Sequence, residues 1–136
     1  MTDTMKLEIV TPAGTVYSDD VETVALPSIA GQIGVYPRHV PLITQMVPGE
    51  MIVRKDGRDL FIATGEGLIE VTARRVAILT DLAIPADRID KAKAEAARQR
   101  AEARLREKLS AEEVATVNAS LARSLAQLRV KRRRRA

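Results

Sequence analysis

Several residue types are scarce in this 136-residue chain, and each scarcity excludes a class of protein. Cysteine is absent, which excludes a disulfide framework and a thiolate metal site. Tryptophan is also absent, and the only aromatic residues are Tyr17, Tyr36 and Phe61, so aliphatic side chains must fill the core. No apolar run approaches the roughly 18 residues that a membrane-spanning helix needs. The first stretch, MTDTMKLEIV, lacks the basic-then-apolar order of a signal peptide, so we expect any membrane association to come through partners.

Glycine and proline are confined to the first 85 residues. Up to about Thr80, short apolar segments alternate with turn signals, a pattern typical of an all-β sandwich or barrel. Asp56-Gly57 lies between two such segments and predicts a β-hairpin, because the favoured two-residue turn needs positive φ at both positions. The sequence therefore predicts an N-terminal β-sandwich over residues 1–85.

Residues 86–136 are rich in alanine and arginine, and their apolar residues recur at intervals of three and four, as in amphipathic helices. We expect a C-terminal antiparallel two-helix hairpin with helices at about 87–108 and 111–131. Asp87 is placed to cap the first helix, with Asp90 in its first turn. Ser110 and Glu113 have the spacing of a capping box for the second. The fold class is therefore β + α.

The predicted seam of the hairpin is poor in large side chains. It consists of Ala94, Ala97, Ala101, Leu105 and Leu109 in the first helix and of Val114, Val117, Leu121, Leu125 and Leu128 in the second. Alanine buries little apolar area, and helices of this length are marginal without packing. We therefore expect a loosely held hairpin that can move relative to the sandwich.

Charge divides at the same boundary. Residues 1–86 hold seven basic and eleven acidic residues, a net charge of −4, whereas residues 87–136 hold fifteen and seven, a net charge of +8. A small β-domain with a basic tail is one interpretation, and the run at 131–135 favours nucleic-acid binding. The acidic first segment and the lack of an aromatic stacking surface count against that alternative.

Chemistry-bearing motifs are also scarce. His39 is the single histidine and has no clustered carboxylates beside it in the sequence, so it predicts neither a metal site nor a catalytic residue. No P-loop or nucleophile motif is present, and Gly65-Glu66-Gly67 is better interpreted as a turn. We expect a protein that is not an enzyme and has no catalytic residues, no metal and no obligatory cofactor.

A family resemblance becomes specific at residues 31–42. The stretch GQIGVYPRHVPL resembles the G-x-[IL]-G-[IVL]-[LY]-P-G-H-x-P-L segment of the epsilon subunit of proton-driven ATP synthases. The similarity continues in order through VPGEM at 47–51, GEGLIEV at 65–71 and VAILTD at 76–81, and it covers nearly the full chain. The resemblance implies a noncatalytic rotor subunit, peripheral to the cytoplasmic face of a bacterial plasma (inner) membrane.

The resemblance also implies partners. In that family the sandwich binds the central gamma stalk and sits on the ring of membrane c subunits, and the helices can extend toward the alpha and beta subunits of the catalytic head and oppose ATP hydrolysis. We expect residues 31–41 to form a rotor-facing loop whose candidate contacts are Gln32, Tyr36, Arg38 and His39. For His39 the alternative is a hydrogen bond within its own loop. Arg38 replaces the glycine of the family pattern and would be strained if that position has positive φ.

Two further sets of residues follow from the hairpin. The candidate contacts to an acidic surface of the catalytic head are Arg123, Arg129, Lys131 and Arg132, with a solvated charged face as the alternative. The stretch IDKAKA at 89–94 resembles the [IL]-D-x-x-R-A motif with which some bacterial epsilon subunits bind regulatory ATP. The corresponding candidates are Ile89, Asp90, Lys93, Ala94, Arg100 and Arg123. The chain departs from that pattern at Lys93, at Gln127 where an arginine is expected, and at Ile84 where an acid is expected.

Overall fold

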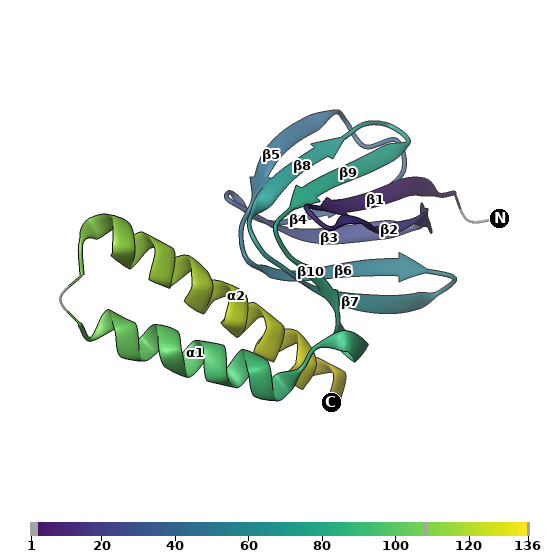
Figure 1. Ribbon diagram of the computed structural model, residues 1–136. Helices are drawn as coiled ribbons and strands as arrows, with labels where there is room; N and C mark the ends of the chain where they lie inside the picture. The colour runs from purple at the N-terminus through teal and green to yellow at the C-terminus, as the bar shows by residue number, and fades with distance from the viewer. Residues whose placement is uncertain (1–2, 108, 136) are drawn as a thin grey trace.

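A computed structural model describes residues 3–107 and 109–135. Figure 1 shows a β-sheet folded over into two layers, with two antiparallel helices beside it. The strands are β1 (Met5–Thr11), β2 (Gly14–Val21), β3 (Thr23–Ser28), β4 (Gly31–Val35), β5 (Leu42–Met46), β6 (Gly49–Lys55), β7 (Arg58–Thr64), β8 (Gly67–Val71), β9 (Arg75–Thr80) and β10 (Ala83–Pro85). A 3-10 turn, η1 (Ala86–Arg88), leads to the helices α1 (Lys91–Leu105) and α2 (Ala111–Arg135).

The strand order is β10-β7-β6-β3-β5-β8-β9-β1-β2, and β4 pairs with β3. The sheet passes from one layer to the other at β3, which pairs with β6 near its start and with β5 at Ser28. Between the layers lies a core of alternating apolar residues that includes Leu7, Leu26, Met51 and Ile78, all fully buried. The predicted β-sandwich followed by a helical hairpin is confirmed.

The turn between β6 and β7 is set by local sequence. Asp56 has φ 53° and Gly57 has φ 74°, the pair of positive values that a two-residue hairpin turn requires. The ladder on either side runs in register from the Lys55–Arg58 pair to the Gly49–Thr64 pair. The hairpin predicted from Asp56-Gly57 is therefore confirmed.

The prediction that all of residues 31–41 form a loop is wrong. Gly31–Val35 is strand β4, and it pairs with β3 from the Ser28–Gly31 pair to the Val24–Val35 pair. Gly31, at φ 110°, follows a tight turn that the Ser28 hydroxyl closes by donating to the Gly31 carbonyl oxygen at 2.6 Å. The glycines therefore permit a hairpin here, and only residues 36–41 lie outside the strands.

The hairpin differs from expectation at the start of its first helix. The Asp90 carboxylate accepts the Lys93 backbone N–H at 3.1 Å, so Asp90 is the N-cap and Asp87 lies in η1. The first helix thus runs over 91–105 instead of 87–108, and Lys108 lies outside the described residues.

The capping box of α2 has formed. The Ser110 hydroxyl accepts the Glu113 N–H at 3.1 Å, and the Glu113 carboxylate accepts the Ser110 N–H at 3.2 Å. The helix then runs beyond the predicted end at 131, because no glycine or proline interrupts it. Within the described residues, no helix combines the length and apolar character that crossing a bilayer requires.

Helix α2 lies between α1 and the sandwich, where it packs on β6 and β7 (Figure 1). Its buried residues include Val117 and Ser124 on one face and Ala126 and Val130 on another. Leu125, expected in the seam, is 45% exposed, so that part of the predicted seam is wrong. The seam differs from the prediction because α2 packs on both α1 and the sandwich. A single apolar stripe accounts for packing on only one of them.

Candidate functional site

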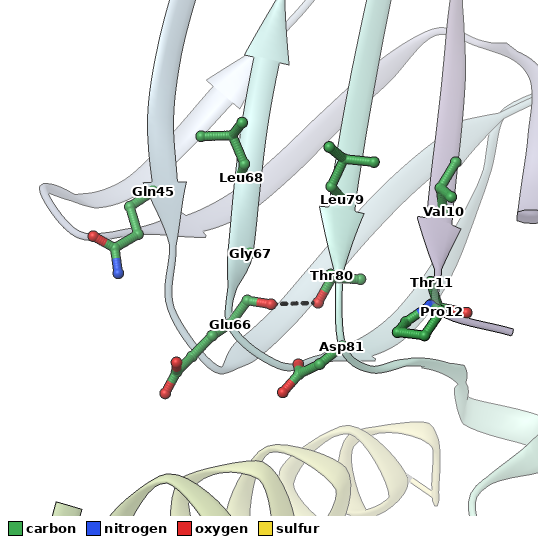
Figure 2. A pocket seen from close by; sticks show the side chains of 10 residues that line it. All are labelled: Val10, Thr11, Pro12, Gln45, Glu66, Gly67, Leu68, Leu79, Thr80 and Asp81. Atoms are coloured by element: carbon green, nitrogen blue, oxygen red, sulfur yellow. Dashed lines mark hydrogen bonds between the residues drawn. The ribbon is translucent and has the colours of Figure 1, made fainter. Parts of the chain in front are cut away.

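A row of side chains crosses the outer face of the sandwich over β5, β8, β9 and β1. Strand register places Gln45 opposite Leu68, Leu68 opposite Leu79, and Leu79 opposite Val10, and we call these four residues the outer row. Figure 2 shows them projecting into a shallow groove of about 770 Å³. Leu68 and Leu79 are 43% and 53% exposed. The two neighbouring leucines form a partly exposed apolar patch on this face.

The outer row exists because the strands alternate. Ile69 and Ile78, next to Leu68 and Leu79 in sequence, point inward and are fully buried. Ile43, on β5, adds a further exposed aliphatic side chain. These antiparallel strands therefore carry apolar residues on both faces, and the outer ones remain partly exposed.

The end of the groove nearest the helices is a close-packed turn. The Thr80 hydroxyl donates to the Glu66 carbonyl oxygen at 2.7 Å, as Figure 2 shows, and accepts the Leu82 N–H at 3.3 Å. A Cβ added to Gly67 would collide with the carbonyl oxygen of Leu79. Gly67 thus allows β8 and β9 to approach, which positions the two leucines side by side.

A tight turn over Tyr36–His39 lies between β4 and β5. The His39 N–H donates to the Tyr36 carbonyl oxygen at 3.1 Å, Pro37 is the second residue, and Arg38 is the third with φ 66°. These are the features of a type II turn, whose third position favours glycine. The strain expected at Arg38 is therefore present, at a cost of about 1–2 kcal/mol. The Arg38 N–H donates to the Ala73 carbonyl oxygen at 2.7 Å, which fixes the turn to the β8–β9 connection.

Three of the four candidate rotor contacts lie together in this turn. Tyr36 and Arg38 are exposed, and the rings of Tyr36 and His39 meet edge to face with centroids 5.5 Å apart. His39 Nδ1 also lies 2.7 Å from the Val40 carbonyl oxygen, so it hydrogen-bonds within its own loop. Gln32 is separate: it lies on β4 opposite Pro27, about 13 Å along the strand from Tyr36.

The hairpin docks on the sandwich through a small apolar cluster. Val130 is fully buried against Ala63, Ala86 and Ile89, with Phe61 and Ile84 packed beside them. Sequence reasoning missed this cluster because Val130 falls outside the predicted seam. The only sign of the cluster in the sequence is that Val130 follows Ala126 by four positions, which places both on one face of the helix.

Two of the predicted head contacts take part in this docking. Arg123 Nη1 lies 3.4 Å from Asp81 Oδ2, and Lys131 Nζ donates to the Ala86 carbonyl oxygen at 3.4 Å. Arg129 and Arg132 are exposed. The four basic residues are thus divided between the docking contact and the free surface.

The candidate nucleotide residues are only partly brought together. Lys93, Ala94 and Arg100 line a groove of about 470 Å³ together with Gln127. Ile89 is buried in the docking cluster and Asp90 caps α1. Arg123 is engaged by Asp81. Two cations therefore face the groove, and an amide occupies the place where the motif expects a third.

Perturbed pKa values occur at contacts that stabilise the fold. The hydrogen bond from Lys55 holds the pKa of Asp19 below its usual range, and Asp19 in turn raises the pKa of Lys55. In the capping box, the Ser110 backbone N–H and then its hydroxyl lower the pKa of Glu113. Among the described residues, no three acidic or histidine side chains are grouped so as to hold a metal ion.

Comparison with known proteins agrees with this division of the chain. The family model described as "ATP synthase, Delta/Epsilon chain, beta-sandwich domain" matches residues 4–86, and "ATP synthase, Delta/Epsilon chain, long alpha-helix domain" matches residues 87–132. The ATP synthase epsilon chain of Herpetosiphon aurantiacus is 41% identical over 131 residues, which covers 96% of each chain. That of Bacillus subtilis is 42% identical over 102 residues, covering 75% of this chain and 77% of the relative.

Solved structures show the same fold at low sequence identity. A chain of the Euglena gracilis mitochondrial ATP synthase aligns with a TM-score of 0.71 at 21% identity, covering 92% of this chain and 78% of that one. A chain of the Tetrahymena thermophila mitochondrial enzyme aligns with a TM-score of 0.64 at 10% identity, covering 99% and 98%. Both family models and relatives of matching length lead to one conclusion: this chain belongs to the ATP synthase delta/epsilon chain family, as a noncatalytic epsilon subunit.

Proposed function

We propose that this chain is a rotor subunit in the central stalk of a proton-translocating ATP synthase. Its sandwich would bind the gamma subunit and rest on the ring of membrane c subunits, and so pass ring rotation to the catalytic head. Family membership favours this function over nucleic-acid binding. Because the curated relatives named above are bacterial, we place the complex at the cytoplasmic face of the bacterial plasma membrane.

The outer row is the observation that carries the proposal. Leu68 and Leu79 are adjacent, half-exposed and held by a rigid ladder, so a partner can cover both without ordering a flexible segment. Complete burial of a leucine contributes about 1.5–3 kcal/mol, so covering the exposed half of two supplies a meaningful part of a protein–protein interface. A rigid sandwich also suits the transmission of torque, since a loose core would yield under load.

A charge placed in the outer row tests the docking surface. Leu79→Asp should weaken binding to the gamma subunit of the same organism by about tenfold or more, because an aspartate would be desolvated in the interface. Leu125→Asp, at a leucine of similar exposure on α2, is the matched control and should bind as wild type does. Surface plasmon resonance measures both. Equal binding by Leu79→Asp and wild type would exclude the outer row as the docking surface.

We also propose that the hairpin regulates ATP hydrolysis. In the docked arrangement Arg123 and Lys131 are occupied by the sandwich, and release of α2 would free them, with Arg129 and Arg132, to contact an acidic surface on the alpha and beta subunits. The net charge of +8 on residues 87–136 supports such a contact. Regulation would then follow from the equilibrium between docked and released hairpins.

Two variants of the assembled enzyme test this regulation. Deletion of residues 87–136 should raise ATP hydrolysis under conditions that normally suppress it. The double variant Arg129→Gln, Arg132→Gln keeps the docked fold, because both side chains are exposed, and should raise hydrolysis in the same direction. If hydrolysis is unchanged in both variants, the hairpin does not inhibit this enzyme.

The groove beside α1 favours a second role, regulatory binding of ATP to the hairpin. Lys93 and Arg100 provide two cations for phosphate, and Ala94 leaves room between them. Calorimetric titration with Mg-ATP should give heat that Lys93→Ala abolishes. Absence of heat for the wild-type chain at millimolar nucleotide would exclude the site.

A further inference from the structure

Arg38 occupies a backbone position that does not suit it. Its φ of 66° lies in the left-handed region, where glycine or asparagine is accommodated without strain. The turn itself does not need an arginine, because its hydrogen bond to Ala73 uses only the backbone N–H. The side chain must therefore be explained by something other than the shape of the turn.

Folding does not explain the side chain either. Its guanidinium Nη2 lies 3.4 Å from Asp3 Oδ2, and the two side chains are 77% and 50% exposed. Pairs this exposed contribute little to stability, because water and salt screen them and two long side chains lose freedom. The contact leaves most of the donors of the guanidinium free for another partner.

The surroundings of Arg38 resemble the centre of a protein interface. Tyr36 and Val40, on either side of it in sequence, are both exposed. Tyrosine and arginine are among the residue types most enriched at the tightest-binding positions of interfaces. Arg74, next to the Ala73 carbonyl that anchors the turn, is a second exposed guanidinium, whereas Arg75 is already paired with Glu8 at 2.9 Å.

The charge of the surroundings selects the class of partner. A guanidinium binds a carboxylate or a phosphate through two parallel hydrogen bonds. Residues 1–86 carry a net charge of −4, which repels an extended polyanion such as nucleic acid. A short group of carboxylates presents few negative charges to the acidic segment, so it meets less of this repulsion where Arg38 and Arg74 lie.

We propose that Arg38 is a specificity-determining residue that, with Arg74, recognises a carboxylate-bearing segment of the rotor protein on which this end of the sandwich docks. The inference rests on the proposed rotor function. Strain at the turn is retained because the guanidinium projects toward the partner from a position that glycine would leave empty. A rotor without an acidic residue at that point would bind this chain less tightly.

Substitution of Arg38 should change stability and binding in opposite directions. Arg38→Gly removes the strain, so the folding equilibrium constant of the isolated chain should rise roughly fivefold. The same substitution should weaken binding to a gamma–ring assembly of the same organism, stripped of this chain, by about tenfold. Arg38→Lys keeps the charge but loses the two-bond geometry, so its affinity should lie between those of wild type and Arg38→Gly. Urea unfolding and biolayer interferometry give the two readouts.

Two further variants separate the specific contact from net charge. Arg58→Gln removes one exposed positive charge elsewhere on the sandwich and should leave the affinity unchanged. Asp3→Asn removes the internal competitor for Arg38 and should strengthen binding up to a few fold.

The possible outcomes distinguish this inference from the proposed function. If wild type binds the gamma–ring assembly and Arg38→Gly binds equally well, the inference is wrong and the rotor function stands. If wild type does not bind the assembly at all, the rotor function fails, and the inference fails with it. Binding of wild type to random-sequence RNA at moderate salt, lost in Arg38→Gly, would also overturn the assignment of a protein partner.

Discussion

Substitution of Val130 should release the hairpin without unfolding the sandwich. Val130 is fully buried in the cluster that joins α2 to β7, η1 and Ile89, and that cluster is separate from the core of the sandwich. Val130→Ala therefore acts on docking alone. We expect the released state to become more populated while the ten-stranded sheet keeps its stability.

The size of the effect follows from what the substitution removes. Two methyl groups leave the cluster, each contributing about 0.8 kcal/mol, and the small cavity left behind brings the loss to about 2 kcal/mol. The other docking contacts are Arg123 to Asp81, which is exposed, and Lys131 to a carbonyl oxygen at 3.4 Å, so each contributes at most about 1 kcal/mol. Val130 is thus the largest of these three contributions, and its substitution should raise the released population about 30-fold.

Hydrogen exchange of the full chain, followed by mass spectrometry, measures this population. Amides of α2 should exchange faster in Val130→Ala, because a released helix of this composition is marginal in water, while those of β1 and β9 keep the wild-type rate. Leu125→Ala, at an exposed leucine of the same helix, is the control and should have little effect. Exchange in α2 at the wild-type rate, or equal acceleration by the two variants, would refute the reasoning.

Three other predictions concern the sandwich and the capping box. Gly67→Ala should cost more than about 3 kcal/mol in urea unfolding, because the added Cβ meets the Leu79 carbonyl oxygen; a loss below 1 kcal/mol would show that the strands separate easily. Gly57→Ala, at φ 74°, should cost about 1 kcal/mol by thermal unfolding, and a stabilised variant would contradict the turn assignment. The pKa of Glu113 is lowered by the Ser110 N–H, so the folded hairpin binds this proton less readily than the unfolded chain does. The stabilisation by Glu113 is present above its pKa in the unfolded chain, about 4.3, and is lost as the pH falls through the lowered pKa of the folded hairpin. Circular dichroism should show this as a loss of helicity at low pH. Glu113→Gln should not show that loss.

Sequence reasoning succeeded where the determining interactions are local. The turn at Asp56-Gly57 needs only two residues with positive φ, and the box between Ser110 and Glu113 closes within one helical turn. Such features are present in the sequence because no distant contact has to be known.

Features that depend on pairing or packing with another element are harder to predict from the sequence. Gly31–Val35 contains two glycines, which favour a loop, but pairing with β3 outweighs their weak strand preference. Asp87 and Asp90 are both suitable caps, and the packing of Ala86 and Ile89 around Val130 accompanies the choice of Asp90. In each instance, pairing or packing with another element selects between two locally acceptable alternatives.

The outer row was invisible for a related reason. Leu68 and Leu79 each look like ordinary alternating strand residues, and only the register of β8 with β9 shows that they are neighbours. Nor does sequence indicate which face of a strand remains uncovered. Gln32 shows the opposite case. It is close to Tyr36 in the sequence motif, but it lies at the other end of β4 in the structure.

The outer groove and the docking contact of the hairpin meet at Asp81. Its carboxylate lines the end of the outer groove and also receives Arg123 from α2, with the two side chains 48% and 33% exposed. A rotor partner that binds Asp81 would compete with Arg123 and so weaken docking of the hairpin. By linkage, docking of the hairpin must lower the affinity for that partner by the same factor. Because an exposed pair contributes at most about 1 kcal/mol, this coupling is bounded at roughly fivefold. The groove and the hairpin can therefore adjust one another through this contact, but docking is governed mainly by the apolar cluster around Val130.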